Sequence, residues 1–187
     1  AYFLEVRDTD YAGAYPLRGV VMNTWNMTPG EVLKNKELSE LVAILGLDIN
    51  DPDSVDRMQY QNIATLTDAD MDGGHIATLL IAFFYKFWPR LIHEGRILMT
   101  RSPIMISTDG KDTKWFFSYD EANKFKQSSE CEKYTHRYLK GLGSLKEEEY
   151  DKIINQPYFE EITVDSPELL EMMFGGDAKL RKEFMMG

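Results

Sequence analysis

Residues 63–75 have the sequence Ile-Ala-Thr-Leu-Thr-Asp-Ala-Asp-Met-Asp-Gly-Gly-His. The first five are apolar or β-branched and predict a buried strand. Three aspartates, Asp68, Asp70 and Asp72, follow the strand at alternate positions. From about His75 to Leu91 apolar residues cover much of a helical circumference, which predicts a largely buried helix. The acidic loop between strand and helix would lie at the carboxyl edge of a sheet, where α/β folds bind ligands.

The neighbouring segments extend this pattern. Short apolar runs predict strands over residues 19–23 and 95–100, and a capped amphipathic run predicts a helix from Thr28 to Gly46. Strands that alternate with helices require crossover connections. We therefore expect an α/β fold with a mainly parallel, Rossmann-like sheet flanked by helices.

The pattern changes after Pro103. Apolar runs on both sides of Asp109-Gly110 predict a β-hairpin. Beyond it, short helical patterns alternate with loops and one strand-like run, at residues 119–127, 146–155, 159–164 and 167–174. We expect a core domain over residues 1–110 and a C-terminal α+β tail, packed on that core, over residues 111–187.

Composition limits the possible classes of function. The chain has 187 residues, 43% hydrophobic and 28% charged, which excludes disordered and low-complexity architectures. No run reaches the roughly 18 apolar residues of a membrane span, so no membrane association is expected. The 21 basic and 31 acidic residues give a net charge of −10. Such a charge argues against a surface that wraps nucleic acid and suits a protein that collects divalent cations.

The three aspartates suggest a metal-assisted phosphoryl site. Adjacent carboxylates repel one another unless a cation neutralises them, and oxygen ligands favour Mg²⁺ over zinc. The alternative is a solvated acidic turn that caps the helix. An EF-hand is excluded because Leu79 stands where the calcium loop needs a glutamate. An Asp-x-Asp phosphatase fits less well, because Met71 and Asp72 follow Asp70 in place of the usual small pair.

The acidic segment also resembles a known signature. Residues 67–76, Thr-Asp-Ala-Asp-Met-Asp-Gly-Gly-His-Ile, are similar to the Asp-x-Asp-x-Asp-Gly-Ser-His-Ile motif in the Toprim domain of type IIA DNA topoisomerases. Three further segments resemble motifs of that family in the family's order: Pro16–Asn23, Lys140–Gly143 and Gly176–Phe184. The particular residues in these motifs most resemble those of the large subunit in the T-even-type bacteriophage members of the family.

The resemblance implies a part in an ATP-dependent type II topoisomerase. Asp68 and Asp70 would act in catalysis by binding Mg²⁺, with Asp72 as a further ligand, and Mn²⁺ or Ca²⁺ could substitute in binding. The substrate would be double-stranded DNA, cut by a tyrosine of a breakage–reunion domain or subunit within a multi-subunit assembly. ATP would be used by a module outside this chain. The expected location is the cytoplasm, that of the bacterial host if a phage encodes the protein.

Three residues are candidates for contact with DNA phosphates. Arg18 could equally form a structural ion pair, and His75 could simply bond within its helix terminus. Lys140 lies next to glycines that let backbone amides approach a phosphate, although a plain glycine turn is the alternative.

Departures from the family pattern predict a weak metal site. The family's metal-binding glutamate lies on a first strand that would precede Ala1, so we expect a fragment of a longer protein, inactive by itself. Val20 replaces a lysine and Gly74 replaces a serine of the family motifs.

Two other functions remain open, namely a Mg²⁺-dependent phosphatase or nuclease and a non-catalytic domain that docks a partner subunit. Cys131, between two glutamates, is expected to be inert, and His136 is expected to be a surface residue.

Overall fold

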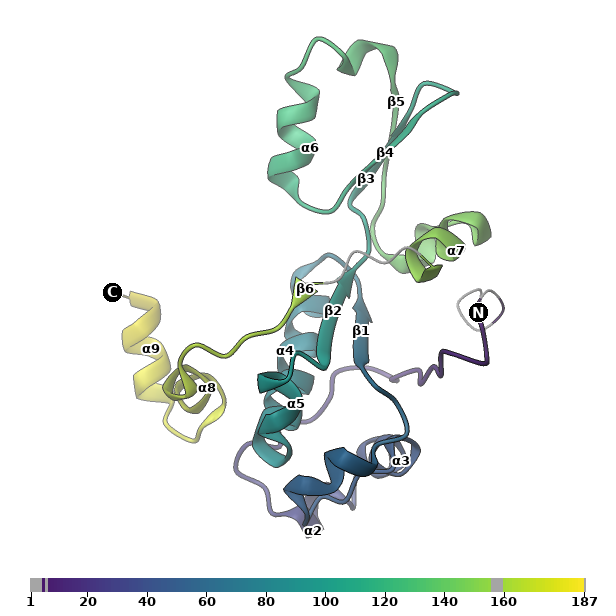
Figure 1. The fold of residues 1–187 in the computed structure, drawn as a ribbon. Helices are drawn as coiled ribbons and strands as arrows, with labels where there is room; N and C mark the ends of the chain where they lie inside the picture. The colour runs from purple at the N-terminus through teal and green to yellow at the C-terminus, as the bar shows by residue number, and fades with distance from the viewer. Residues whose placement is uncertain (1–4, 6, 156–159, 187) are drawn as a thin grey trace. The chain divides into compact units, whose positions relative to one another are not determined.

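Strand β1 (Ile63–Thr67) leads through the acidic loop into helix α4 (Met71–Phe87) in the computed structural model, which describes residues 5, 7–155 and 160–186. The chain returns as strand β2 (Ile97–Arg101) beside β1 (Figure 1). The Ile63 N–H donates to the Arg96 carbonyl at 2.8 Å and the Ser102 N–H donates to the Thr67 carbonyl at 3.1 Å, so the two strands run in the same direction. The predicted α/β fold, with helices flanking a small parallel sheet, is confirmed.

A third strand completes this sheet in the order β1-β2-β6. Strand β6 (Glu160–Glu161) pairs antiparallel with β2. It falls within the strand predicted over 159–164, whose first residue, Phe159, lies outside the described residues.

The predicted hairpin belongs to a second, antiparallel sheet. Strands β3 (Met105–Thr108) and β4 (Thr113–Phe116) flank the turn, where the Asp109 carboxylate accepts the N–H groups of Lys111 and Asp112. Strand β5 (Thr135–Tyr138), which the sequence patterns did not predict, pairs with the other side of β3.

The remaining elements are helical. They are α2 (Pro29–Val32), α3 (Lys36–Leu45), η1 (Pro52–Arg57), α5 (Pro89–His93), α6 (Tyr119–Lys126), η2 (Cys131–Lys133), η3 (Leu142–Ser144), α7 (Glu147–Asn155), α8 (Pro167–Phe174) and α9 (Ala178–Met186).

Among the described residues, no helix has both the length and the apolar content needed to cross a membrane.

The chain forms two packing units, each with its own core. The hairpin unit comprises the described residues of 1–14, 66–74 and 100–159, and the helical unit those of 15–65, 75–99 and 160–187. In the helical unit, α4 packs its aromatic side chains against α3, η1 and β2. The hairpin unit buries two smaller clusters around β3. The predicted division into 1–110 and 111–187 is a different partition and stays a prediction.

The strand predicted over residues 19–23 is wrong. The segment is extended and buries Val21, but none of the described strands pairs with it. Its polar groups bond to other elements instead: the Asn23 amide donates to the Phe174 carbonyl at 2.9 Å. Pairing decides whether an apolar run becomes a strand, and no local pattern reports a missing partner.

Two predicted helices have different bounds. The helix predicted from Thr28 to Gly46 is split into α2 and α3 because Asn35 caps a new start, its side chain accepting the Leu38 N–H at 3.0 Å. Its predicted end is confirmed, with Gly46 in the left-handed conformation at φ 71°. The helix predicted from about His75 begins earlier, at Met71, and breaks at Trp88, since a residue before proline avoids helical geometry.

Trp88 is the centre of the helical unit's core. It is fully buried. Its indole N–H is shared between two acceptors, with Nε1 3.0 Å from the Ser54 hydroxyl oxygen and 3.1 Å from the Asp48 carbonyl oxygen. The rings of Phe83, Phe84 and Phe87 lie within 6.3 Å of its ring centroid. One side chain therefore joins α4 to the loop before η1.

We expect Trp88→Ala to lower the free energy of unfolding by about 3–5 kcal/mol, because it leaves a large cavity in this core. Trp88→Phe keeps most of the apolar contact but removes the donor, and should cost about 1–3 kcal/mol. Leu169→Ala, at an exposed position of α8, should change stability by less than about 0.5 kcal/mol. Urea unfolding followed by circular dichroism measures all three, and equal losses at Trp88 and Leu169 would contradict this account.

Candidate metal centre

Asp68 is held in place by the backbone at the carboxyl end of β1. Ser102 donates its N–H to the Thr67 carbonyl, and its hydroxyl accepts the Ala69 N–H at 3.2 Å. Ser102 is fully buried. The residues before and after Asp68 are therefore bonded to the same neighbour, which holds the main chain at Asp68 in place.

The Asp68 carboxylate binds the loop that follows β5. Its Oδ1 accepts the Leu142 N–H at 2.7 Å. Two further bonds anchor the ends of this loop. At its start the Leu139 N–H donates to the Ile104 carbonyl at 2.9 Å, and at its end the Leu142 carbonyl accepts the Tyr150 hydroxyl at 2.7 Å. The predicted Lys-Gly-Leu-Gly segment is thus brought to the first aspartate of the acidic cluster, 74 residues away along the chain.

Glycine at position 141 makes this approach possible. A Cβ on Gly141 would lie 2.5–2.8 Å from the carboxyl atoms of Asp68, which is closer than such atoms come in proteins. The requirement is spatial, since the φ of Gly141 is 163°, an extended value open to any residue. A Cβ on Gly143, the second glycine of the motif, would meet nothing within 4 Å.

Asp70 caps helix α4. Its Oδ1 accepts the Gly73 N–H at 2.8 Å, and its carbonyl accepts the Gly74 N–H at 3.1 Å, which is the geometry of a helix N-cap. A Cβ on Gly73 would lie 2.1 Å from the Asp68 carbonyl, so the first turn of α4 can close over the end of β1 only with glycine there. Asp72 lies exposed in the same turn, where an acid favours the helix dipole.

The three carboxylates provide the oxygen ligands that Mg²⁺ prefers, but they do not converge into a metal-binding group. Two of them already use Oδ1 to accept backbone N–H groups. In the part of the chain that the structure describes, no three His, Cys, Asp or Glu side chains converge so as to hold a metal ion. Asp68, Asp70 and Asp72 therefore suit Mg²⁺ by the type of ligand they offer. That they bind one ion together stays a prediction.

The candidate DNA contacts fall in different packing units. Lys140 is exposed between the two anchored leucines of the Asp68 loop, in the hairpin unit. Arg18 and His75 are also exposed but belong to the helical unit, where the backbone N–H of Arg18 donates to the Glu37 carboxylate at 3.0 Å. Arg137, close to Lys140 in sequence, pairs with Glu149 and has a structural role.

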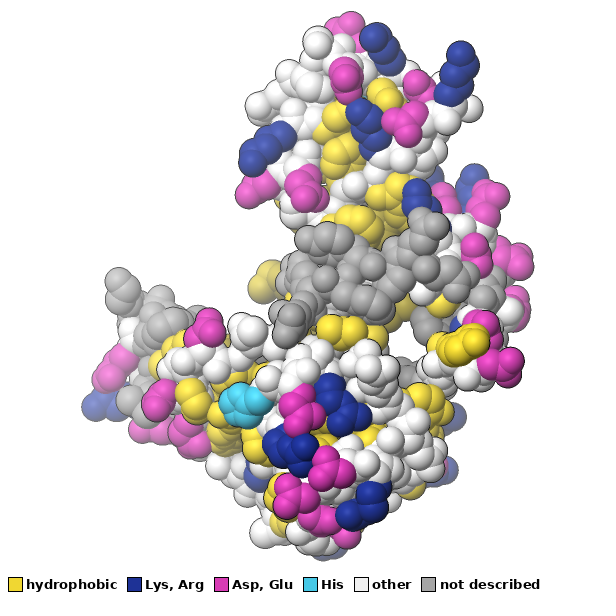
Figure 2. Space-filling model, in the orientation of Figure 1, with side chains coloured by type: hydrophobic (Ala, Val, Ile, Leu, Met, Phe, Trp, Pro, Cys, Tyr) yellow, Lys and Arg dark blue, Asp and Glu magenta, His cyan; other side chains and the backbone are white. Residues whose placement is uncertain are grey.

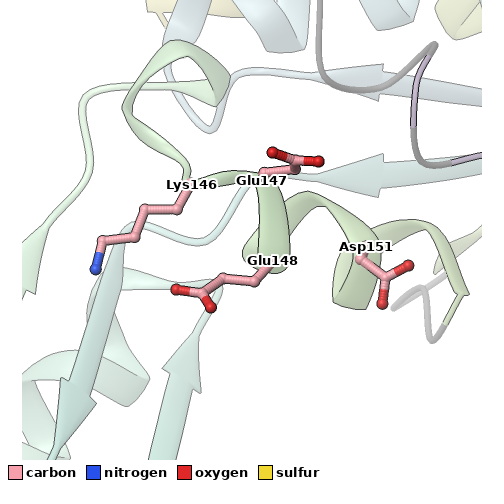
Figure 3. A pocket seen from close by; sticks show the side chains of 4 residues that line it. All are labelled: Lys146, Glu147, Glu148 and Asp151. Atoms are coloured by element: carbon pink, nitrogen blue, oxygen red, sulfur yellow. The ribbon is translucent and has the colours of Figure 1, made fainter.

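A separate open hollow of about 600 Å³ lies along the start of α7. Lys146, Glu147, Glu148 and Asp151 line it, and Figure 3 shows that the three carboxylates point in different directions. This arrangement does not resemble a cation site.

Sequence patterns missed the residues that support Asp68. Ser102 and Tyr150 are ordinary positions in the sequence, and their importance depends on backbone contacts across the fold. Only the Lys-Gly-Leu-Gly motif gave a signal for this loop, through its first glycine.

No family model matches the chain. Over 131 residues, however, the chain is 40% identical to the DNA topoisomerase small subunit of Enterobacteria phage T4, an alignment that covers 68% of this chain and 80% of that protein. The chain belongs to the type II DNA topoisomerase family. The phage relative is described as a small subunit, whereas the residues of the motifs had suggested the large subunit.

Other members of the type II topoisomerase family agree with this assignment. A DNA gyrase subunit of Thermotoga maritima is 28% identical over 188 residues, which is 97% of this chain and 30% of that protein. A crystal structure of the Plasmodium falciparum topoisomerase II DNA-binding, cleavage and re-ligation domain matches with a TM-score of 0.83 at 27% identity, over 99% of this chain and 26% of the other. This chain therefore spans less than a third of the length of these two relatives.

The contact between Gly141 and Asp68 predicts a difference between the two glycines of the motif. Gly141→Ala should push the Asp68 carboxylate away from the Leu142 N–H and lower the free energy of unfolding by about 1–3 kcal/mol. Gly143→Ala should change it by less than about 0.5 kcal/mol. Urea unfolding gives the energies, and the amide resonance of Leu142 reports the bond. A larger effect at Gly143 would show that the loop is packed differently.

Tyr150 offers a probe of the Asp68 charge. Burial raises the pKa of the Tyr150 hydroxyl, and the nearby negative charge of Asp68 raises it further. Because the folded state then holds this proton more tightly than the unfolded chain, the stabilisation is complete below the ordinary tyrosine pKa of about 10 and is lost as pH rises through the folded value. NMR titration of ¹³C-labelled tyrosine should show a lower Tyr150 pKa in Asp68→Asn. The Asp177→Asn variant serves as control, and an unchanged Tyr150 pKa in Asp68→Asn would place the two groups apart.

Proposed function

We propose that this chain is the Toprim domain of a type II DNA topoisomerase, and that Asp68, Asp70 and Asp72 supply oxygen ligands to Mg²⁺ during cleavage and religation of double-stranded DNA. The observation that supports the proposal is the position of Asp68, fixed at the carboxyl end of β1 and bound to the Leu142 N–H at 2.7 Å. A carboxylate already oriented by the fold needs no reorganisation when it acts.

The residues around Asp68 have separate tasks in this proposal. When bound, Mg²⁺ would stabilise negative charge on the attacking and leaving oxygens of a phosphoryl transfer. Asp68 would offer its second oxygen to the ion, while the Asp70 cap sets the direction of α4, whose N-terminal end favours anions. Lys140, exposed on the adjacent loop, would contact a phosphate of the DNA.

The rest of the reaction would depend on other parts of the assembly. We propose that the nucleophilic tyrosine comes from a partner subunit or domain, that a separate module hydrolyses ATP, and that this chain alone cuts no DNA. Its net charge is −10. On the face shown in Figure 2, the described Lys and Arg side chains lie among Asp and Glu and form no continuous basic area, so most phosphate contacts would belong to the partner.

A docking role without catalysis is the second candidate. It is favoured by one observation: Asp68 and Asp70 each already have a structural task, one holding the 139–142 loop and the other capping α4. The phosphatase or nuclease alternative has no comparable support in the family to which the chain belongs.

Metal binding separates the two candidates. We expect Asp68→Asn combined with Asp70→Asn to abolish the weak binding of Mn²⁺, used as a paramagnetic stand-in for Mg²⁺, because the charged ligands are removed while the hydrogen-bond acceptors stay. Glu148→Gln, an exposed acid of α7, is the matched control and should bind as the unaltered chain does. Proton relaxation of water measures the bound fraction. Unchanged Mn²⁺ binding in the double variant would support the docking role.

The same double variant can be tested in a reconstituted assembly. Relaxation of supercoiled DNA should be lost while ATP hydrolysis continues. Full relaxation activity would overturn the catalytic proposal even if the metal binding had changed.

A further inference from the structure

Three side chains with the chemistry of an activated nucleophile meet in the hairpin unit, apart from the acidic cluster. The Cys131 Sγ lies 3.1 Å from Nε2 of His136, and Nδ1 of the same ring lies 2.8 Å from the Ser107 hydroxyl. A nucleophile, a base, and a third group that orients the base form the arrangement that activates thiols and hydroxyls in enzymes. Sequence analysis had predicted an inert Cys131 and a surface His136, and these contacts lie outside both expectations.

The register of the second sheet produces this contact. Ser107 on β3 and His136 on β5 are direct cross-strand partners, so their side chains lie on the same face. Ser107 is fully buried, and a buried hydroxyl requires a partner, which the imidazole provides. The turn of η2 then brings Cys131, five residues before His136, to the other ring nitrogen.

The Ser107 hydroxyl bonds Nδ1, the ring nitrogen opposite the one that contacts the thiol. If the Ser107 oxygen accepts a hydrogen from Nδ1, the neutral ring has its lone pair on Nε2, which points at Sγ. The ring can then take the thiol proton without turning, and both hydrogen bonds persist after the transfer.

The charged groups around the thiol have partners of their own. Glu130, next to Cys131, pairs with Lys114 of β4 at 2.8 Å. The Lys114 ammonium also lies over the ring of Tyr134, whose hydroxyl donates to the Asp112 carboxylate at 3.0 Å.

On the side of α6, the Phe125 ring meets His136 edge to face, with ring centroids 6.1 Å apart. The remaining charged neighbours in sequence, Glu132 and Lys133, are exposed and opposite in sign. Of the two acids that flank Cys131 in sequence, Glu130 is paired with Lys114 and Glu132 is exposed to solvent, which weakens its effect on the thiol.

We propose that Cys131 is a reactive thiol and a site of covalent modification by soft electrophiles, in particular low-molecular-weight disulfides. His136 takes the proton from Sγ, and the thiolate attacks one sulfur of the disulfide. A new S–S bond forms at Cys131 as the original S–S bond breaks, and the departing thiolate takes the proton from His136. Cys131 is thereby oxidised and one half of the reagent is reduced. Ser107 acts as a positioning residue, through His136.

Modification rates test the proposal in the full chain, whose single cysteine makes the product unambiguous by intact mass. The probes are iodoacetamide and glutathione disulfide, each also used in urea to give the rate of the same thiol without its neighbours. At pH 7 the folded protein should react faster than the protein in urea. In His136→Gln the folded-state rate should fall about tenfold, since the base is removed. His93→Gln, at an exposed position in the helical unit, should react as the unaltered chain does.

Ser107 is tested through the pH dependence of the same rate. Ser107→Ala should shift the pH of half-maximal rate, and Ser107→Thr, which keeps the hydroxyl, should restore it. If His136→Gln fails to fold, its rates with and without urea will coincide, and the comparison of the unaltered chain with its own urea reference still decides. A folded unaltered chain that reacts no faster than in urea, or a folded His136→Gln that keeps the full rate, would overturn the proposal.

Discussion

The hydrogen bond from the Leu142 N–H to the Asp68 carboxylate connects the two parts of the hairpin unit that the family motifs occupy. One end is fixed by Ser102 at the edge of β1, and the other by the anchored residues Leu139 and Tyr150. The acceptor lies in the loop between β1 and α4 and the donor is the first residue of η3, so this short bond between a charged acceptor and a backbone donor joins two elements distant in sequence. Bonds of this kind are stronger than neutral ones, and breaking this one would leave the donor to be satisfied elsewhere.

Two of the three acids in the cluster thus have a structural task before any metal is considered. Asp70 closes the first turn of α4, and Asp68 holds the 139–142 loop. A structural role does not exclude a catalytic one, because a carboxylate has two oxygens and the bonded one orients the other. Membership of the type II topoisomerase family gives the proposed catalytic role its context, and the backbone N–H groups of Leu142 and Gly73 explain how the fold accommodates two of the three aspartates.

The sequence predicted what depends on local patterns. Strand β1 has the predicted bounds, the Asp109-Gly110 hairpin is present, and Gly46 ends its helix in the left-handed conformation. The wrongly predicted strand over residues 19–23 and the missed strand β5 depend instead on distant segments. Each outcome was decided by whether another segment pairs its backbone N–H and C=O groups with the run. For the site, the sequence pointed to the Lys-Gly-Leu-Gly segment but not to its bond with Asp68, and Ser102 and Tyr150 carry no pattern. The contact of Cys131 with His136 depends on a register that only the paired strands define.

The order in which the chain visits its two packing units has a consequence for how it can be divided. The path changes unit after residues 14, 65, 74, 99 and 159, so β1, α4 and β2 each start in one unit and end in the other. A single cut of the backbone cannot release either unit whole, unlike domains joined by one linker. Any deletion that ends inside β1, α4 or β2 would therefore remove residues from both cores at once.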